Sequence, residues 1–187
     1  MVKTNINLFA EGEVAYTDGG VLAEFAWVLV VLPFIAALII TFAGKSLPLK
    51  GAEIALGTIG IIFIYSLALM YLHVTEGVAN EFFINVGNIG QFDIEFGWVV
   101  DGLSIMMYFV VGLVALLVFI YATNYMEGEI RYTFFFTSLT LFAGSMLVLV
   151  SSPTLIQILI GWELVGVCSY LLIGHYWEVK DNSSAAM

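Results

Sequence analysis

The sequence predicts an all-α membrane protein, a polytopic bundle of five transmembrane helices with a small outer β-hairpin between the second and third helices. The first observation is composition, because 61% of the 187 residues are hydrophobic and only 11% are charged. The mean hydropathy of +1.04 lies well above that of a soluble globular domain. The second observation is that the apolar residues fall into separate runs, each long enough to cross a bilayer. The third is that short breaks containing Gly, Ser or Pro separate most of these runs.

The five apolar runs define the expected helices in chain order. Each run approaches or exceeds the roughly 20 residues that a helix needs to cross the hydrocarbon core. They cover residues 21–43, 53–74, 102–126, 132–150 and 154–177. Residues 1–20 precede them as an acidic N-terminal tail, and residues 21–187 form one membrane domain. Because most connections are short, neighbouring helices are expected to run antiparallel.

The connection from Thr75 to Val100 is the only long one, and it has the pattern of a β-hairpin. Two short segments, Phe82 to Val86 and Gln91 to Phe96, are separated by the turn sequence GNIG. Apolar and acidic residues alternate in the second segment, which predicts strands with one buried face. We expect this hairpin to cap the outer end of the bundle.

Charge and cysteine content exclude several classes of protein. The formal net charge is -10, with five basic residues, so no basic surface for nucleic acid is expected. The single cysteine, Cys168, excludes an internal disulfide and a cysteine metal cluster. No cleavable signal peptide is expected, because acidic residues rather than a basic segment precede the first apolar run.

The basic residues predict the orientation in the membrane. Alternating the five spans places four of them on one side, and the positive-inside rule assigns that side to the cytoplasm. These four are Lys45, Lys50, Arg131 and Lys180, while Lys3 lies on the other side. The sequence therefore predicts an integral protein of the bacterial inner (plasma) membrane, with the lipid bilayer around it. Its N-terminus is expected outside and the end of its fifth helix in the cytoplasm.

Glu163 is the strongest candidate for a functional residue, because it lies near the middle of the fifth apolar run. An acidic side chain at that depth costs roughly 2.5–3.5 kcal/mol on insertion scales and must face protein or water. Intramembrane acids usually have a function, and proton transfer is the chemistry expected of this one. The alternative is a buried structural acid that is protonated or hydrogen-bonded to a neighbouring helix.

Other polar residues of the same run are secondary candidates. Helical spacing places Gly166 and Tyr170 on the face of Glu163, while Gln157, Cys168 and Ser169 lie on a second surface. Tyr170 and His175 are candidate relay residues, although His175 lies about three turns away and an interfacial histidine is the simpler interpretation. Asp101, just before the third helix, is interpreted as a helix cap.

Two segments resemble a known family. GWELVGVCSYLLIGHYWEVKDNSSAAM, which contains Trp162, Glu163, Gly166, Cys168 and Ser169, is similar to the fifth helix of subunit L (chain 5) of NADH-quinone oxidoreductase, respiratory complex I. VVDGLSIMMYFVVGLVALLVFIYATNYMEGE, which contains Asp101, resembles the third helix of the same family. The resemblance extends from Trp27 to Met187. It is most specific around Glu163 and weak in the first two helices.

The resemblance implies an antiporter-like membrane subunit that helps to pump protons while other subunits pass electrons from NADH to quinone. It implies no cofactor in this chain, with NADH, FMN, iron-sulfur clusters and quinone in partner subunits, and other membrane subunits of complex I as partners. It also implies that Glu163 is one half of a glutamate and lysine pair. The lysine of the family lies two helices further on, so we expect this chain to be the N-terminal fragment of a longer subunit.

Two alternatives remain open at this point. One is the large subunit of a multisubunit sodium/proton antiporter or of a membrane-bound hydrogenase, which share the fold and the acidic helix. The other is a non-pumping structural fragment. In the pumping hypothesis, a carboxyl group in the membrane core has its pKa raised by desolvation, and an approaching ammonium group lowers it again. A partner that approaches and withdraws would thereby drive release and recapture of a proton.

Overall fold

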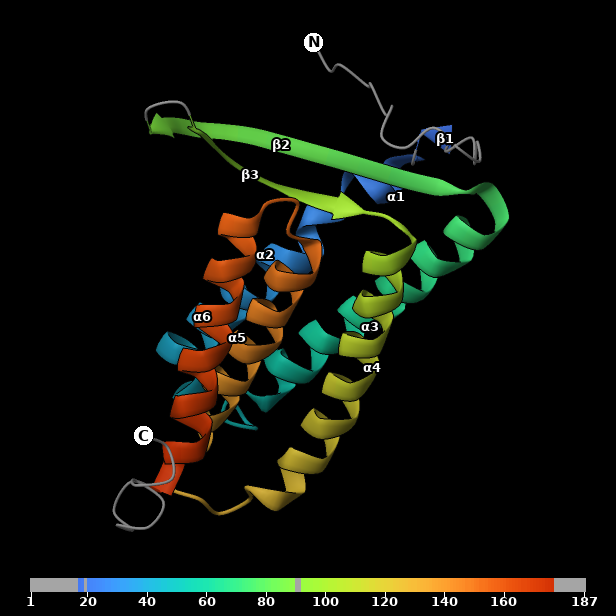
Figure 1. The fold of residues 1–187 in the computed structure, drawn as a ribbon. Helices are drawn as coiled ribbons and strands as arrows, with labels where there is room; N and C mark the ends of the chain where they lie inside the picture. Colours follow the sequence, from blue (N-terminus) through green and yellow to red (C-terminus); the bar gives the residue numbers. More distant parts are fainter. Residues whose placement is uncertain (1–16, 19, 90–91, 177–187) are drawn as a thin grey trace.

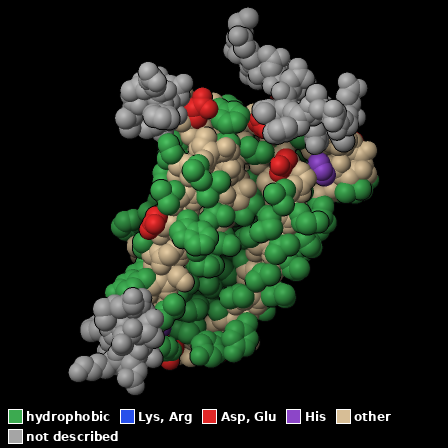
Figure 2. Space-filling model, viewed as in Figure 1, with side chains coloured by type: hydrophobic (Ala, Val, Ile, Leu, Met, Phe, Trp, Pro, Cys, Tyr) green, Lys and Arg blue, Asp and Glu red, His purple; other side chains and the backbone are tan. Residues whose placement is uncertain are grey.

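Five long helices stand side by side, and a β-hairpin lies across one end of them (Figure 1). The computed structural model describes residues 17–18, 20–89 and 92–176. The long helices are α2 (Trp27–Ala43), α3 (Ala52–Glu76), α4 (Gly102–Tyr125), α5 (Tyr132–Ser151) and α6 (Leu155–Ile173). All five are long and apolar enough to cross a membrane. Hydrophobic side chains cover most of the bundle's flank in Figure 2. The predicted fold class is therefore confirmed.

The first apolar run differs from the expectation, because it forms two helices instead of one. A short helix, α1 (Gly20–Glu24), precedes α2, and the chain turns at Phe25 and Ala26. In a continuous helix the Leu22 carbonyl would accept the Ala26 N–H. Instead it accepts the hydroxyl of Tyr65 on α3 at 2.6 Å, and the Ala26 N–H bonds to the Ala23 carbonyl at 3.3 Å. This contact with α3 accompanies the break in the run.

The hairpin is present, and its strands are longer than predicted. Strand β2 (Val78–Ile89) pairs antiparallel with β3 (Phe92–Val100), with a register shift between Asn85 and Gly87. Three residues of the predicted GNIG turn, 87–89, belong to β2, while residues 90 and 91 lie outside the described residues. A two-residue strand, β1 (Thr17–Asp18), pairs parallel with the start of β2. The pairing extends beyond the predicted segments because both strands continue to the ends of α3 and α4.

The prediction of one buried hairpin face is wrong for β2. Residues 81–86 are all exposed, among them Phe82, Phe83, Ile84 and Val86. The physical reason is that the hairpin crosses the bundle end and its far end projects past α6 (Figure 1), so no helix lies beneath all of its length. Alternation in a sequence reports two unlike faces of a strand, but it does not report how far a supporting layer extends.

The interior of the bundle is built from aromatic and aliphatic side chains, with glycines at the closest helix contacts. Phe119 on α4 meets Phe136 on α5 edge to face, with ring centroids 6.1 Å apart, and both are fully buried. A Cβ atom on Gly112 of α4 would lie 3.2 Å from Phe63 Cα on α3. One on Gly144 of α5 would lie 3.0 Å from Pro33 Cβ on α2. Small residues at these contacts let the helices approach closely, as is usual in membrane bundles.

The helices differ in length and inclination. Helices α3 and α4 have 25 and 24 residues, whereas α5 and α6 have 20 and 19. In Figure 1 the two longer helices are inclined to α5 and α6, α3 most of all. Between α4 and α5 a half-open pocket of about 240 Å³ is lined by apolar side chains that include Val111, Phe142 and Met146.

The end of the bundle opposite the hairpin carries the turns between α2 and α3 and between α4 and α5. Lys45, Lys50 and Arg131 lie there, and the Lys50 carbonyl accepts a hydrogen bond from Thr133 Oγ1 at 3.0 Å. Lys50 and Gly51 take up left-handed backbone conformations, with φ of 51° and 98°, in the tight turn before α3. Lys3, Lys180 and tail residues 1–16 lie outside the described residues. The predicted division into tail and membrane domain and the orientation in the membrane stay predictions.

Candidate functional site

Glu163 lies close to the middle of α6. The helix begins at Leu155 after the N-cap residue Thr154 and ends at Ile173. At about 1.5 Å of rise per residue, Glu163 is about 12 Å from the first residue of the helix and about 15 Å from the last. Within the bounds of α6 this is the depth that the sequence predicts for it.

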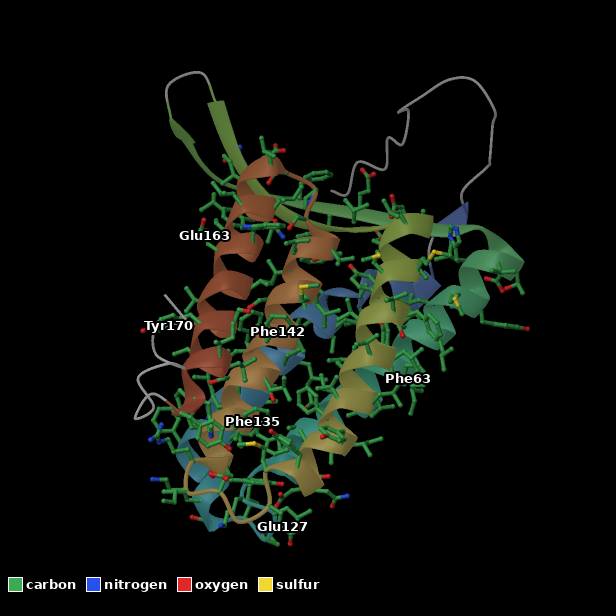
Figure 3. All side chains as sticks on the ribbon, turned by 60° about the horizontal axis from the view of Figure 1, so that its bottom comes forward. Phe63, Glu127, Phe135, Phe142, Glu163 and Tyr170 are labelled. Atoms are coloured by element: carbon green, nitrogen blue, oxygen red, sulfur yellow. The ribbon has the colours of Figure 1, made fainter. Side chains whose placement is uncertain are left out.

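The carboxylate of Glu163 points away from the other helices. Figure 3 shows Glu163 and Tyr170 projecting from the same outer flank of α6, while Phe142 lies toward the interior. The exposed side chains around it include Leu159, Trp162, Val167 and Tyr170, and Gly166 has open space where a Cβ would be. Within the part of the chain that the structure describes, Glu163 makes no hydrogen bond or ion pair. An acid so placed in hydrocarbon is unfavourable, so further protein or water is expected to cover this face.

The opposite side of α6 packs against α5. Its buried residues are Gln157, Gly161 and Cys168. A Cβ atom on Gly161 would lie 2.9 Å from Leu149 Cα, so the two helices approach closely there. Cys168 Sγ lies 3.8 Å from Ser145 Oγ on α5, and both residues are buried. Ser169 is half-buried. The two surfaces that helical spacing distinguishes on this run are thus separate, one packed and one exposed.

His175 is not brought near Glu163. It lies in the 3-10 turn η2 (Gly174–Tyr176), twelve residues or about 18 Å further along the chain. Its ring is buried against the rings of Phe134 and Phe135 on α5, with centroids 6.3 and 5.6 Å away. Its carbonyl accepts a hydrogen bond from Arg131 Nη1. Tyr170 is about 10 Å along the axis from Glu163, on the same face.

Asp101 is engaged at the start of α4, away from α6. Its Oδ1 accepts the Ser104 N–H at 2.7 Å, while Ser104 Oγ accepts the Asp101 N–H at 2.8 Å. This reciprocal pair is a capping box. The carboxylate is therefore used by the backbone of α4, as its position just before the helix indicates.

A polar contact that sequence reasoning missed joins α6 to the hairpin. The Gln157 side chain accepts the Gly97 N–H at 2.9 Å and donates to the Gly97 carbonyl at 2.8 Å. The available signals were a glutamine in the first turn of an apolar helix and an isolated glycine in a strand pattern, which often marks close backbone approach. Neither signal identifies the other residue as its partner, because 60 positions separate them.

The described residues hold no group of three or more His, Cys, Asp or Glu side chains that could bind a metal ion. The expectation that this chain carries no cofactor of its own stays a prediction. Among the acidic residues in the described part of the chain, Glu163 is the one that lies near the middle of a long helix, and an isolated carboxyl group there can take up and release a proton.

Comparison with known proteins gives one consistent result. Residues 87–136, from the hairpin into α5, match the family model described as NADH-Ubiquinone oxidoreductase (complex I), chain 5 N-terminus. The NAD(P)H-quinone oxidoreductase chain 5 of Synechocystis sp. is 37% identical over 171 residues, which cover 88% of this chain and 25% of that protein. The NADH-quinone oxidoreductase subunit L of Escherichia coli is 36% identical over 170 residues, covering 84% and 26%.

A protein of the organellar chromatophore of Paulinella chromatophora, NAD(P)H-quinone oxidoreductase subunit 5, is 36% identical over 170 residues, covering 87% of this chain and 26% of that protein. The chain spans about a quarter of the length of the curated relatives that it matches. The resemblance stated from the two sequence motifs is confirmed. The family match ends within α5, so the similarity of α6 to this family rests on the longer matches to the relatives.

Proposed function

We propose that this chain is part of a proton-translocating membrane subunit of an NADH-quinone oxidoreductase. The premise is its similarity to the N-terminus family model of complex I chain 5 and to about a quarter of the length of chain 5 relatives. In this proposal the electrons pass from NADH to quinone in partner subunits, and Glu163 is a proton relay in the membrane. The observation that carries the proposal is the placement of one carboxylate at the middle of α6, in a bundle whose relatives are subunits of such enzymes by name.

The exposed face around Glu163 supports the proposal. A structural acid would be expected to have hydrogen-bonding partners in the bundle that it stabilises, because a buried polar group without a partner is costly. Glu163 instead projects from α6 with its carboxylate away from the packed seam (Figure 3). Its partner would come from protein outside the described residues. A face that leaves the acid open to a second group is suited to a partner that approaches and withdraws.

The mechanism follows from the electrostatics of carboxyl groups. Removal from water favours the neutral acid, while a nearby cation favours the carboxylate. Movement of a cationic group toward and away from such a side chain therefore converts motion into release and uptake of a proton. Tyr170, on the same face, is a candidate to pass that proton along α6, and His175 is a candidate nearer the end of the helix.

The setting of the chain is proposed on the same grounds. We place it in the bacterial inner membrane, with other membrane subunits of complex I as partners and with FMN, iron-sulfur clusters and quinone held by partner subunits. Lys45, Lys50 and Arg131 lie at one end of the bundle, and their positive charge supports a cytoplasmic location for that end. The hairpin would then face the outside.

A non-pumping structural role is the alternative, and the observation that favours it is the row of exposed apolar side chains around Glu163, among them Leu159, Trp162 and Val167, because such a face suits contact with another protein. In that case the carboxylate would serve only to bind a neighbouring subunit.

The test is Glu163→Gln, which preserves the shape of the side chain and removes its titration. In membrane vesicles we expect the initial rate of NADH-driven proton uptake to fall roughly tenfold or more, because a positioned proton-transfer group contributes on the order of 10²- to 10⁴-fold to a rate. The matched control is Glu127→Gln, in the exposed turn after α4. Proton uptake at the parental level in Glu163→Gln would disprove the relay.

A further inference from the structure

We infer that Gln157 is a positioning residue, which fixes the rotation of α6 about its axis and thereby the direction in which Glu163 points. The functional part of this inference rests on the proposed relay role of Glu163. The structural part does not, and it can be measured separately.

Three hydrogen bonds join the first turn of α6 to the edge of β3. Gln157 makes the two bonds to the Gly97 backbone, and Thr154 Oγ1 donates to the Glu95 carbonyl at 3.1 Å. Glu95 and Gly97 are alternate residues, so their outward backbone groups lie on one edge of the strand. The glutamine amide uses its oxygen as the acceptor and one N–H of its NH2 group as the donor, and so replaces the peptide group that a neighbouring strand would offer.

This contact is buried and leaves no freedom to slide. Gln157 is only 6% exposed, in the apolar seam of α6. A Cβ atom on Gly97 would lie 1.8 Å from the Phe82 carbonyl oxygen across the hairpin. A shift of the amide by one residue along β3 would place it beside Phe96 or Trp98, whose N–H and C=O groups point to the other edge of the strand, toward β2. The amide is therefore held at one position on the strand.

The hairpin is itself fastened to α3 and α4, so it can serve as a fixed reference for α6. His73 Nδ1 lies 2.7 Å from the Val78 carbonyl at the start of β2. The Tyr108 hydroxyl donates to the Val99 carbonyl near the end of β3 at 3.3 Å. Helix α6, in contrast, packs mainly against α5. The contact at Gly97 thus gives α6 a second point of attachment, far along the chain from the first.

Helical geometry converts this attachment into a direction for Glu163. At about 100° per residue, Gly161 and Cys168 lie within about 40° of Gln157 around the axis, whereas Glu163 lies about 120° away. With Gln157 turned toward β3 and Cys168 toward α5, Glu163 must project from the exposed flank. A rotation of α6 that released the amide would turn the carboxylate through the same angle.

The native cysteine makes the rotation measurable. Ser145→Cys on α5 places a second thiol where the Ser145 hydroxyl now lies 3.8 Å from Cys168 Sγ. In native membranes, copper phenanthroline should oxidise this pair rapidly to an intrachain disulfide, which is quantified by mass spectrometry of the linked peptides. Failure of the pair to cross-link would contradict the packing of α6 and overturn the inference.

The decisive variant is Gln157→Met in the Ser145→Cys background, which preserves volume and removes both amide bonds. The cross-linking rate should fall about tenfold, since the net loss of two hydrogen bonds is worth about that factor in an equilibrium. Ile158→Leu, at the next position of the same turn, is the matched control and should cross-link like the parent. An unchanged rate in Gln157→Met would overturn the inference.

A second pair decides the question if Gln157→Met does not accumulate in membranes. In the same Ser145→Cys background, Thr154→Val removes both the bond to Glu95 and the cap bond from the Gln157 N–H, whereas Thr154→Ser keeps the hydroxyl that makes both. Slower cross-linking in Thr154→Val and recovery in Thr154→Ser support the inference, while equal rates in both overturn it.

Proton uptake separates this inference from the proposed function. If Gln157→Met lowers both cross-linking and the rate of NADH-driven proton uptake, and Glu163→Gln lowers uptake alone, both are supported. If Glu163→Gln abolishes uptake while Gln157→Met pumps normally with slowed cross-linking, Gln157 fixes α6 but pumping does not need it. The functional part of the inference is then wrong, and the relay stands. If Glu163→Gln pumps normally, the relay is wrong, and the cross-linking result alone decides whether Gln157 fixes α6.

Discussion

The hydroxyl of Tyr65 on α3 hydrogen-bonds to the carbonyl of Leu22 on α1 at 2.6 Å, where the first apolar run breaks into two helices. Tyr65→Phe removes this bond alone and should weaken the attachment of α1 by about 1 kcal/mol. Hydrogen exchange across residues 20–26 should then accelerate several-fold in detergent-solubilised protein. Tyr71→Phe, at an exposed tyrosine of the same helix, is the control. Equal exchange in the two variants would show that the bond does not hold α1.

The capping box at Asp101 predicts a graded effect on stability. Asp101→Ala should lower the free energy of unfolding by about 1 kcal/mol, because it leaves the Ser104 N–H without its acceptor. Asp101→Asn retains an acceptor oxygen and should cost much less. Thermal unfolding of the solubilised protein measures both. If the asparagine variant lost as much stability as the alanine variant, the charge of Asp101, rather than its cap geometry, would be what matters.

The same residue provides a comparison for pumping. Glu163→Ala should reduce the initial rate of NADH-driven proton uptake in vesicles far more than Asp101→Asn, because Asp101 is engaged by the α4 backbone and Glu163 is the candidate relay. The loss in Glu163→Ala should be roughly tenfold or more, the size expected for a proton-transfer group. Equal losses in the two variants would contradict the assignment of Asp101 as a cap.

Two glycines of the hairpin should respond differently to alanine. Gly97→Ala creates a contact of 1.8 Å with the Phe82 carbonyl, whereas a Cβ on Gly87 meets nothing within 4 Å. We expect Gly97→Ala to separate the strands, with a cost of at least about 1–3 kcal/mol, the usual range for overpacking. Limited proteolysis should then cleave the hairpin faster than in Gly87→Ala. Similar cleavage rates would show that the approach of the strands at Gly97 is not required.

Two glycines of α6 should separate its packed face from its exposed face. Gly161→Ala forces Leu149 aside and should destabilise the solubilised chain by about 1–3 kcal/mol. Gly166→Ala meets open space within the described residues and should be neutral or slightly stabilising, since alanine favours a helix by about 1 kcal/mol over glycine. Thermal unfolding in detergent tests both. Destabilisation by Gly166→Ala only in the assembled enzyme would indicate that another protein surface covers that face.

The fold class could be predicted from the sequence because bilayer thickness limits helix length. The bounds of α4 and α5 differ from the predicted runs by a single residue at one end of each. The break before α2 could not be predicted, because the contact that accompanies it comes from Tyr65, 43 positions away from Leu22. The buried hairpin face was wrong for β2 for a related reason. The pattern within a strand does not say where the helices beneath it end.

Part of the candidate site was accessible from the sequence in the same way. Periodicity separates Glu163 and Tyr170 from Gln157 and Cys168, since a helix repeats its directions every 3.6 residues. It does not say which of the two surfaces packs inward, and it gives no partner for Gln157. That partner is a backbone group of Gly97, which carries no side-chain signature. The relay roles of Glu163, Tyr170 and His175 stay predictions.

The unequal lengths of the helices set how this protein fits its bilayer. Helix α6 is about 28 Å long and α3 about 37 Å, at about 1.5 Å per residue. Both can match a single hydrocarbon slab only if the longer helix leans, which accords with the inclination of α3 in Figure 1. In a thickened membrane α3 can meet the mismatch by becoming more upright, whereas α6 has no spare length. Hydrophobic mismatch would therefore fall on the short helices, α2 with 17 residues, α6 with 19 and α5 with 20, and so on the helix that bears the carboxylate.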